Sequence, residues 1–81
     1  MAHVVANSDC RQFTGGAIEF DLDVGTVREM IDVLEARYPG LGVFVDKRMA
    51  IAIDGEIHQD AWFAPLTAKS EVYLIPKIGG G

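Results

Sequence analysis

A chain of 81 residues has room for one compact domain with a single hydrophobic core, and for no separate catalytic or regulatory domain. Its 49% hydrophobic and 23% charged residues are typical of a globular protein and exclude intrinsic disorder. The net charge of −5 argues against nucleic acid and anionic membranes as partners, because both select basic surfaces, and it favours a protein partner with a positive surface.

Compartment and metal content follow from what the sequence lacks. It contains no apolar run near the roughly 20 residues that span a bilayer, and it begins without the features of a signal peptide, so we expect a cytoplasmic protein. Cys10 has no partner for an internal disulfide; we expect a small apolar strand residue rather than a reactive thiol. His3 and His58 are far apart in sequence and lack other ligand-type neighbours, so we assign no metal site.

The first predicted elements are two strands. His3 to Cys10 opens with branched apolar residues and is predicted to be a strand with a polar end, and Thr14-Gly15-Gly16 is predicted to be a turn. Ala17 to Asp23 alternates apolar and acidic residues with the period of a half-buried strand. We therefore expect these two strands to pair as a hairpin.

An amphipathic helix is predicted next. Thr26 and Glu29 have the spacing of a capping box, in which each side chain satisfies a backbone N–H at a helix start. Pro39 disfavours helical geometry in the residue before it, so the helix should end near Arg37-Tyr38. The apolar positions recur at spacings of three and four and form an ordinary core stripe: Val27, Met30, Ile31 and Leu34.

The second half of the chain is predicted to contain three strands. Met49 to Ile53 is followed by Asp54-Gly55, a dipeptide that favours a tight hairpin turn, and by the short strand Glu56 to His58. The last strand is Glu71 to Pro76, and proline ends it because it lacks a ladder donor. The order strand, strand, helix, strand, strand, strand predicts an α+β fold, in which one main helix covers one face of a mixed sheet of four to five strands. The expected core consists of Ile18, Phe20, Leu22, Met30, Ile31, Leu34, Ile51, Ile53 and Leu74.

Four apolar residues fall in segments predicted to be loops, namely Leu41, Phe44, Trp62 and Phe63. Residues 59–69 form one of these loops, and 41–48 joins the helix to the third strand. Apolar side chains in loops can form a partner-binding patch. They can equally close the ends of a small core, and the sequence leaves both interpretations open.

The end of the sequence is rich in glycine. We divide the chain into a domain at 1–76 and a flexible tail at 77–81, because glycine loses much conformational entropy on ordering. A frayed terminus is one explanation. A working end is the other: five extended residues reach roughly 16 Å, and glycine lets a narrow channel admit the backbone.

These fragments, in this order, resemble the sulfur carriers of the molybdenum-cofactor and thiamin pathways, the MoaD and ThiS families, from end to end. The resemblance lies in six segments: Thr14-Gly15-Gly16, Gly25-Thr26-Val27-Arg28-Glu29, Arg37-Tyr38-Pro39-Gly40, Ile51-Ala52-Ile53-Asp54-Gly55-Glu56, Pro65-Leu66, and Glu71-Val72-Tyr73-Leu74-Ile75-Pro76 running into Gly80-Gly81. It implies a ubiquitin-like β-grasp fold.

The resemblance also implies a function. An adenylating enzyme of the ubiquitin-activating type would use ATP on the carboxylate of Gly81, and a sulfur donor such as a cysteine desulfurase or a rhodanese would convert it to a thiocarboxylate. The chain itself would bind no cofactor and would serve as co-substrate, or as the small subunit of molybdopterin synthase beside the large subunit. Residues expected to touch partners are Gly80, Gly79, Ile78, Lys77 and Pro76, with Phe44 and Phe63.

Several positions depart from the family pattern. Asp54 stands where asparagine is frequent, Ala68-Lys69-Ser70 replaces an acidic turn, and Lys77 replaces a frequent second proline. Residues 41–48 resemble the molybdenum branch more than the shorter thiamin carriers, and this favours the molybdopterin role. The alternatives are a carrier for thiamin or another sulfur-containing metabolite, a ubiquitin-like protein modifier, and a non-catalytic interaction domain.

Overall fold

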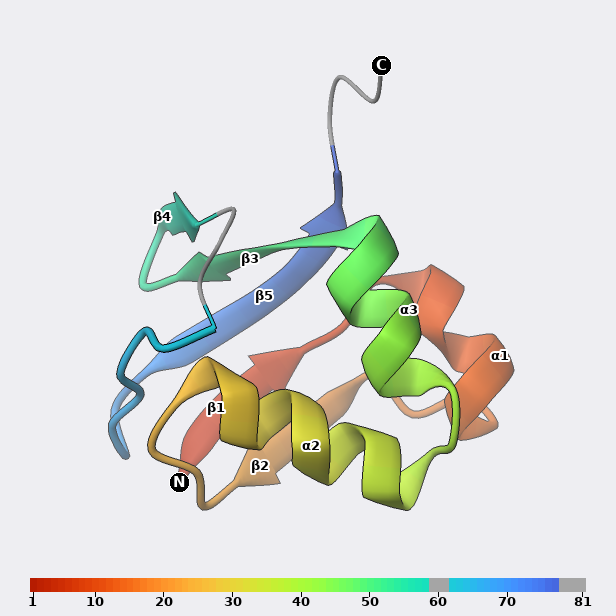
Figure 1. Ribbon diagram of the computed structural model, residues 1–81, viewed down its shortest axis with the longest axis horizontal. Coiled ribbons are helices and arrows are strands. Elements are labelled where there is room, and N and C mark those ends of the chain that lie inside the picture. The colour runs from red at the N-terminus through yellow and green to blue at the C-terminus, as the bar shows by residue number, and fades with distance from the viewer. Residues whose placement is uncertain (59–61, 78–81) are drawn as a thin grey trace.

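A five-stranded mixed sheet with helices on one face makes up the computed structural model, which describes residues 1–58 and 62–77 (Figure 1). The α+β class and the β-grasp arrangement are confirmed. In chain order the elements are β1 (Ala2–Val5), a short 3₁₀ turn (Ser8–Cys10), α1 (Arg11–Thr14), β2 (Glu19–Leu22), α2 (Val27–Arg37), α3 (Leu41–Arg48), β3 (Met49–Ile53), β4 (Glu56–His58) and β5 (Glu71–Pro76).

Strand β5 lies in the middle of the sheet, whose strand order is β2-β1-β5-β3-β4. It runs parallel to β1, with Val4 opposite Val72, and antiparallel to β3, with Ile51 opposite Leu74. The central strand therefore has its backbone paired on both sides. Because β5 comes last among the strands, the segment that follows it leaves from the centre of the sheet.

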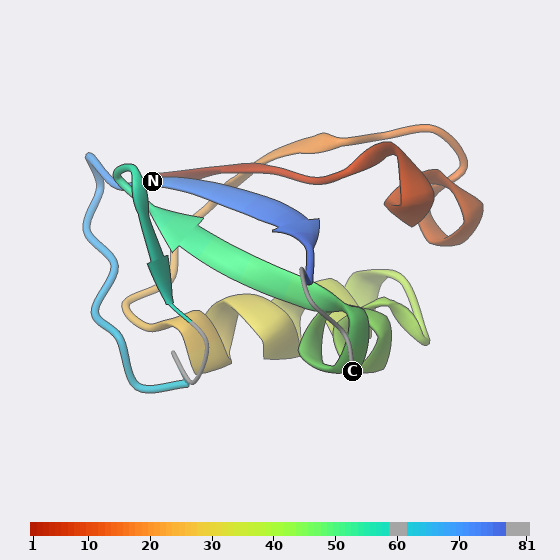
Figure 2. The ribbon, with the colours of Figure 1, turned by 90° about the horizontal axis from the view of Figure 1, so that it is seen from above.

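The core lies between the sheet and the two longer helices. Figure 2 shows α2 and α3 on one side of the sheet and the opposite face uncovered. Strand residues alternate accordingly: Val72 and Leu74 are buried, whereas Tyr73 between them is exposed. Every expected core residue is buried except Ile18, which is partly exposed and packs against the core from its edge.

The first strand is shorter than predicted. It ends at Val5, and the chain turns into helical structure at Ser8 instead of continuing extended to Cys10. The side chain of Asn7 accepts a hydrogen bond of 2.8 Å from the Asp9 amide and caps this turn. Short polar side chains compete in this way with strand pairing. Strands β1 and β2 still pair antiparallel, but the connection contains helical turns and is no tight hairpin.

Helix α2 begins and ends as predicted. Thr26 is its N-cap, and its hydroxyl accepts a hydrogen bond of 3.2 Å from the Glu29 amide. The Glu29 carboxylate accepts from the amide of Gly25, at 3.4 Å, rather than from that of Thr26 as a full capping box would require. Tyr38 is the C-cap, directly before Pro39.

Residues 41–48, predicted to be a loop, form helix α3. Its N-terminus is capped by a side chain from the neighbouring helix: the Glu35 carboxylate accepts hydrogen bonds from the amides of Gly40 (2.8 Å), Gly42 (2.9 Å) and Val43 (3.3 Å). These bonds, first the one from Gly40, hold the pKa of Glu35 below its ordinary value. The cap is a tertiary contact, because Glu35 belongs to α2 and the amides belong to the start of α3.

Gly42 allows α2 and α3 to approach closely. A Cβ atom at this position would lie 2.7 Å from Cβ of Glu35 and 3.1 Å from the Ile31 carbonyl oxygen. Both neighbours belong to α2, and one is backbone. Glycine at this point is therefore a packing requirement of the seam between the two helices.

We predict that Gly42→Ala destabilises the fold by about 1–3 kcal/mol, the usual cost of overpacking a tight contact. The sign is diagnostic, because alanine normally stabilises a helix interior relative to glycine. Urea unfolding followed by circular dichroism measures the change. Gly25→Ala is the matched control, since its nearest contact would be 3.7 Å from Glu29 Oε1. An unchanged or increased stability of Gly42→Ala would contradict the account.

Candidate functional site

The end of β5 forms a fixed base for the segment that follows. Pro76 lies opposite Met49, at the start of β3. Pairing continues one residue further, because the Lys77 amide donates a hydrogen bond of 3.1 Å to the Arg48 carbonyl. The Lys77 ammonium donates to the carbonyl of Asp46 at 3.3 Å. A proline at position 77 could not donate the amide bond.

The expected working end lies outside the described residues. This holds for Ile78, Gly79, Gly80 and Gly81. Of the predicted tail contacts, Pro76 and Lys77 are described, and both are exposed.

A broad depression of about 670 Å³ lies at this base. It lies between the end of β5, the last turns of α3 and the segment 9–12. Three predicted partner-binding residues line it, namely Phe44, Pro76 and Lys77. Its lining consists of Asp9, Gln12, Phe44, Lys47, Arg48, Met49, Pro76 and Lys77. Sequence reasoning missed the two cations at the end of α3; the adjacent pair Lys47-Arg48 was the available signal.

The four apolar residues from predicted loops occupy different environments in the structure. Leu41 is fully buried and belongs to the core. Phe44, on α3, is half-buried, and its ring lies 5.0 Å from the Phe13 ring. Phe63 is 79% exposed and is not among the residues that line the depression. The structure thus brings Phe44, but not Phe63, to the base of the tail.

Trp62 supports the start of α2. Its carbonyl accepts a hydrogen bond of 2.9 Å from the Arg28 amide, and its ring lies 5.5 Å below the Arg28 guanidinium. The same loop continues the contact, because the Ala64 carbonyl accepts from the Val27 amide at 3.1 Å. Backbone donors at a helix start need such partners. Trp62 is half-buried and also borders a hollow between α2 and α3.

Cys10 is buried, and it lies in the 3₁₀ turn, so its predicted place in a strand is wrong. Burial raises the pKa of its thiol. A thiolate is the reactive form of cysteine, so the raised pKa and the burial of the thiol both suppress nucleophilic chemistry at this position. The structure therefore gives Cys10 a packing role.

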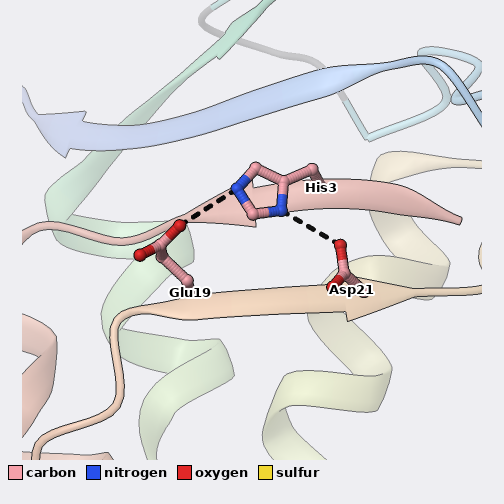
Figure 3. A network of polar contacts seen from close by, with 3 residues as sticks. All are labelled: His3, Glu19 and Asp21. Carbon is pink, nitrogen blue, oxygen red and sulfur yellow. Dashed lines mark hydrogen bonds and ion pairs between the residues drawn. The ribbon is translucent and has the colours of Figure 1, made fainter.

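The other polar cluster lies on the uncovered face of the sheet, across β1 and β2. Figure 3 shows the His3 imidazole between two carboxylates, with Nδ1 3.0 Å from Asp21 and Nε2 3.2 Å from Glu19. The hydrogen bond with Asp21 is the main cause that raises the pKa of His3 above 6.5. Glu71 of β5 lies opposite His3 in the sheet and adds a further carboxylate to this face. Each ring nitrogen contacts a different carboxylate, an arrangement that favours the imidazolium because both of its nitrogens are donors.

Two further features concern the part of the chain that the structure describes. Within residues 1–58 and 62–77, no group of three or more His, Cys, Asp or Glu side chains is arranged to hold a metal ion. Among the helices there, none combines the length and apolarity needed to cross a bilayer.

Solved structures with this fold define its class. The chain superposes with a TM-score of 0.84 on a protein from a BexX/CysO complex of Amycolatopsis orientalis, at 20% identity over 100% of both chains. It matches Mycobacterium tuberculosis CysO, described as an antigen, with a TM-score of 0.84 at 18% identity, covering 96% of this chain and 100% of that one. Small archaeal modifier protein 1 of Methanosarcina acetivorans gives 0.77 at 21% identity, over 99% and 95%. The fold is that of the ubiquitin-like β-grasp proteins.

A family model identifies the chain further. The model of the ThiS family matches residues 4–81, nearly the whole sequence. The chain therefore belongs to the ThiS family, a family of small ubiquitin-like sulfur carriers, as its sequence motifs indicated. Comparison with curated proteins gave no match.

We predict a pH-dependent contribution of His3 to stability. Because its pKa is raised in the folded protein, the imidazolium stabilises the fold fully below 6.5, the ordinary value, and this contribution is lost as pH rises through the folded pKa. The difference in unfolding free energy between wild type and His3→Gln should be largest near about pH 5.5 and smallest near about pH 8.5. Urea unfolding across this range measures it.

The variant Asp21→Asn tests the cause of this dependence. It removes the acceptor charge that contributes most to the raised pKa. Replacing His3 in the Asp21→Asn background should then give a flatter pH profile. A stability difference that grows with increasing pH would contradict the assignment of His3 as a stabilising imidazolium.

Proposed function

We propose that this protein is a sulfur carrier whose Gly81 carboxylate is adenylated and then converted to a thiocarboxylate that donates sulfur. The observation that carries the proposal is the match to the ThiS family over residues 4–81, which includes the glycine-rich segment. The base of that segment supports it, because Pro76 and Lys77 are held by β3 and by Arg48.

The chemistry needs a partner enzyme, because a carboxylate is a poor electrophile. In the proposed cycle a carboxylate oxygen of Gly81 attacks the α-phosphate of ATP, and pyrophosphate leaves. The terminal sulfur of a protein persulfide then attacks the acyl carbon and displaces AMP. A thiol reductant cleaves the remaining S–S bond and leaves the thiocarboxylate. The chain contributes the carboxylate and a slim glycine backbone that fits a narrow channel.

The favoured pathway is molybdenum-cofactor biosynthesis, with the chain as the small subunit of molybdopterin synthase. The segment that resembles this branch, residues 41–48, forms helix α3 and lines the depression at the base of the tail. The proposed partners are an adenylating enzyme of the ubiquitin-activating type, a cysteine desulfurase or rhodanese, and the synthase large subunit. A carrier for thiamin or for another sulfur-containing metabolite would use the same first steps.

A second candidate is a protein modifier. The structural similarity to small archaeal modifier protein 1 supports this candidate. A modifier shares the adenylation step but ends in an isopeptide bond to lysine. Higher-mass conjugates that resist reducing agents would distinguish this function from sulfur delivery.

We predict that the full chain, incubated with ATP, an adenylating enzyme of this type and a persulfide donor, gains the mass expected when one sulfur replaces one oxygen. Intact-protein mass spectrometry measures the gain. Gly81 deletion should abolish it, because the acceptor carboxylate moves by one residue. Ile57→Ala is the matched control, since this exposed side chain of β4 lies outside the depression and has no predicted partner role, so its loss should leave the gain unchanged.

Three results would overturn the proposal. One is sulfur incorporation that persists at an unchanged rate after deletion of Gly81. Another is a wild-type chain that forms no adenylate, measured by ATP–pyrophosphate exchange, with any adenylating enzyme of the source organism. A gain in mass that maps to Cys10 by peptide analysis would likewise show that the site is wrong.

A further inference from the structure

Basic side chains gather around the base of the tail although the protein as a whole is acidic. The chain has 7 Lys and Arg residues against 12 Asp and Glu residues. The depression at the end of β5 reverses this ratio: Lys47, Arg48 and Lys77 line it beside a single carboxylate, that of Asp9. We call the three cations the basic root surface. The net charge of −5 predicted a partner with a positive surface, whereas the positive basic root surface calls for a negative one.

Backbone pairing fixes the three cations relative to one another. Lys47 and Arg48 occupy the last turn of α3, and the Arg48 carbonyl accepts the Lys77 amide at 3.1 Å. All three residues are exposed. In the described parts of the chain, the ion pairs of Lys and Arg side chains are confined to Arg28 with Asp32. The charges of the basic root surface are therefore free of side-chain partners there.

Internal stabilisation accounts for only part of this arrangement. Cations in the last turn of a helix interact favourably with the helix dipole, and this explains Lys47 and Arg48. It does not explain Lys77, which follows a strand and whose ammonium contacts the Asp46 carbonyl. Three cations around one depression, with no side-chain ion pair among residues 1–58 and 62–77, indicate a ligand with negative charge.

Distance separates two sources of that charge. A tail entering a partner in extended form would carry the Gly81 carboxylate about 13 Å beyond Lys77, at about 3.3 Å for each residue. The phosphate of an acyl-adenylate at Gly81 would thus lie beyond the side chains of the basic root surface. What these side chains would meet is the protein surface around the entrance through which the tail passes.

We propose that the basic root surface docks on acidic side chains that surround the tail entrance of the adenylating enzyme. The inference rests on the proposed sulfur-carrier function and deepens it by naming the charge of the partner surface. Complementary charges of this kind accelerate association and orient the partners more than they strengthen the final complex. The tail supplies the reacting group, and the basic root surface aligns it with the entrance.

The test compares two triple variants of equal net charge. One is Lys47→Gln, Arg48→Gln, Lys77→Gln. The matched control is Arg28→Gln, Arg37→Gln, Lys69→Gln, which neutralises three exposed cations outside the depression and outside the segment 9–12. The readout is ATP–pyrophosphate exchange by the adenylating enzyme of the source organism, with carrier concentration varied. The first variant should raise KM for the carrier about tenfold at low salt and leave kcat within about twofold, whereas the control should stay near wild type.

Salt dependence and charge-conserving replacement complete the test. The difference between variant and wild type should shrink in about 0.5 M NaCl, where screening is strong. Lys47→Arg, Arg48→Lys, Lys77→Arg should restore the wild-type KM. Equal effects of the two neutral variants, an effect that does not change with salt, or a loss in kcat alone would each overturn the inference. Absence of any exchange with wild type would overturn the proposed function as well, and so separates the two failures.

Discussion

The pairing of β5 between β1 and β3 is the constraint on which the rest of the structure depends. Its two inward side chains, Val72 and Leu74, are buried against the helices, and its backbone is paired with neighbours on both edges. A central strand cannot shift register by one residue without moving its apolar side chains to the opposite face. The last residue of the domain is therefore fixed in position and direction, and the proposed tail inherits a rigid base.

The contacts between α2 and α3 fix the position of α3, which carries two residues of the basic root surface. Glu35 caps α3 from α2, and Gly42 lets the two helices approach closely. Helix α3 passes into β3 without a linker, since Arg48 ends the helix and Met49 begins the strand. Met49 in turn lies opposite Pro76. The end of the helix and the end of the central strand thus meet because β3 pairs with β5.

Much of the fold could be predicted from local patterns. The alternation around Phe20, the capping Thr26 and the Asp54-Gly55 turn, whose residues both adopt positive φ angles, each mark an element correctly. Helix α3 could not be found in this way, because Gly40 at its N-cap offers no side chain and the cap comes from Glu35. The polar residues after Val5 were included in the predicted strand as a weak end, and gave no sign that a helical turn begins at Ser8.

The candidate site likewise contains residues that local sequence patterns indicated and residues that only tertiary pairing brings together. The importance of Pro76 and Lys77 followed from their place before the glycines, but Lys47 and Arg48 join them only through the β3–β5 register, which the sequence does not state. Phe44 and Phe63 were both predicted to touch partners as apolar residues in loops; Phe44 lies on α3 and lines the depression, whereas Phe63 lies in the loop before β5 and is not part of the lining.

The central claim is that this protein carries sulfur as a C-terminal thiocarboxylate. Its most direct test is the intact mass of the protein isolated from its own cells, without added enzymes or sulfur donors. The account predicts a thiocarboxylate form at Gly81 that disappears when the adenylating enzyme is deleted. A protein that carries only the free carboxylate in sulfur-replete cells, whether or not that enzyme is present, would contradict it.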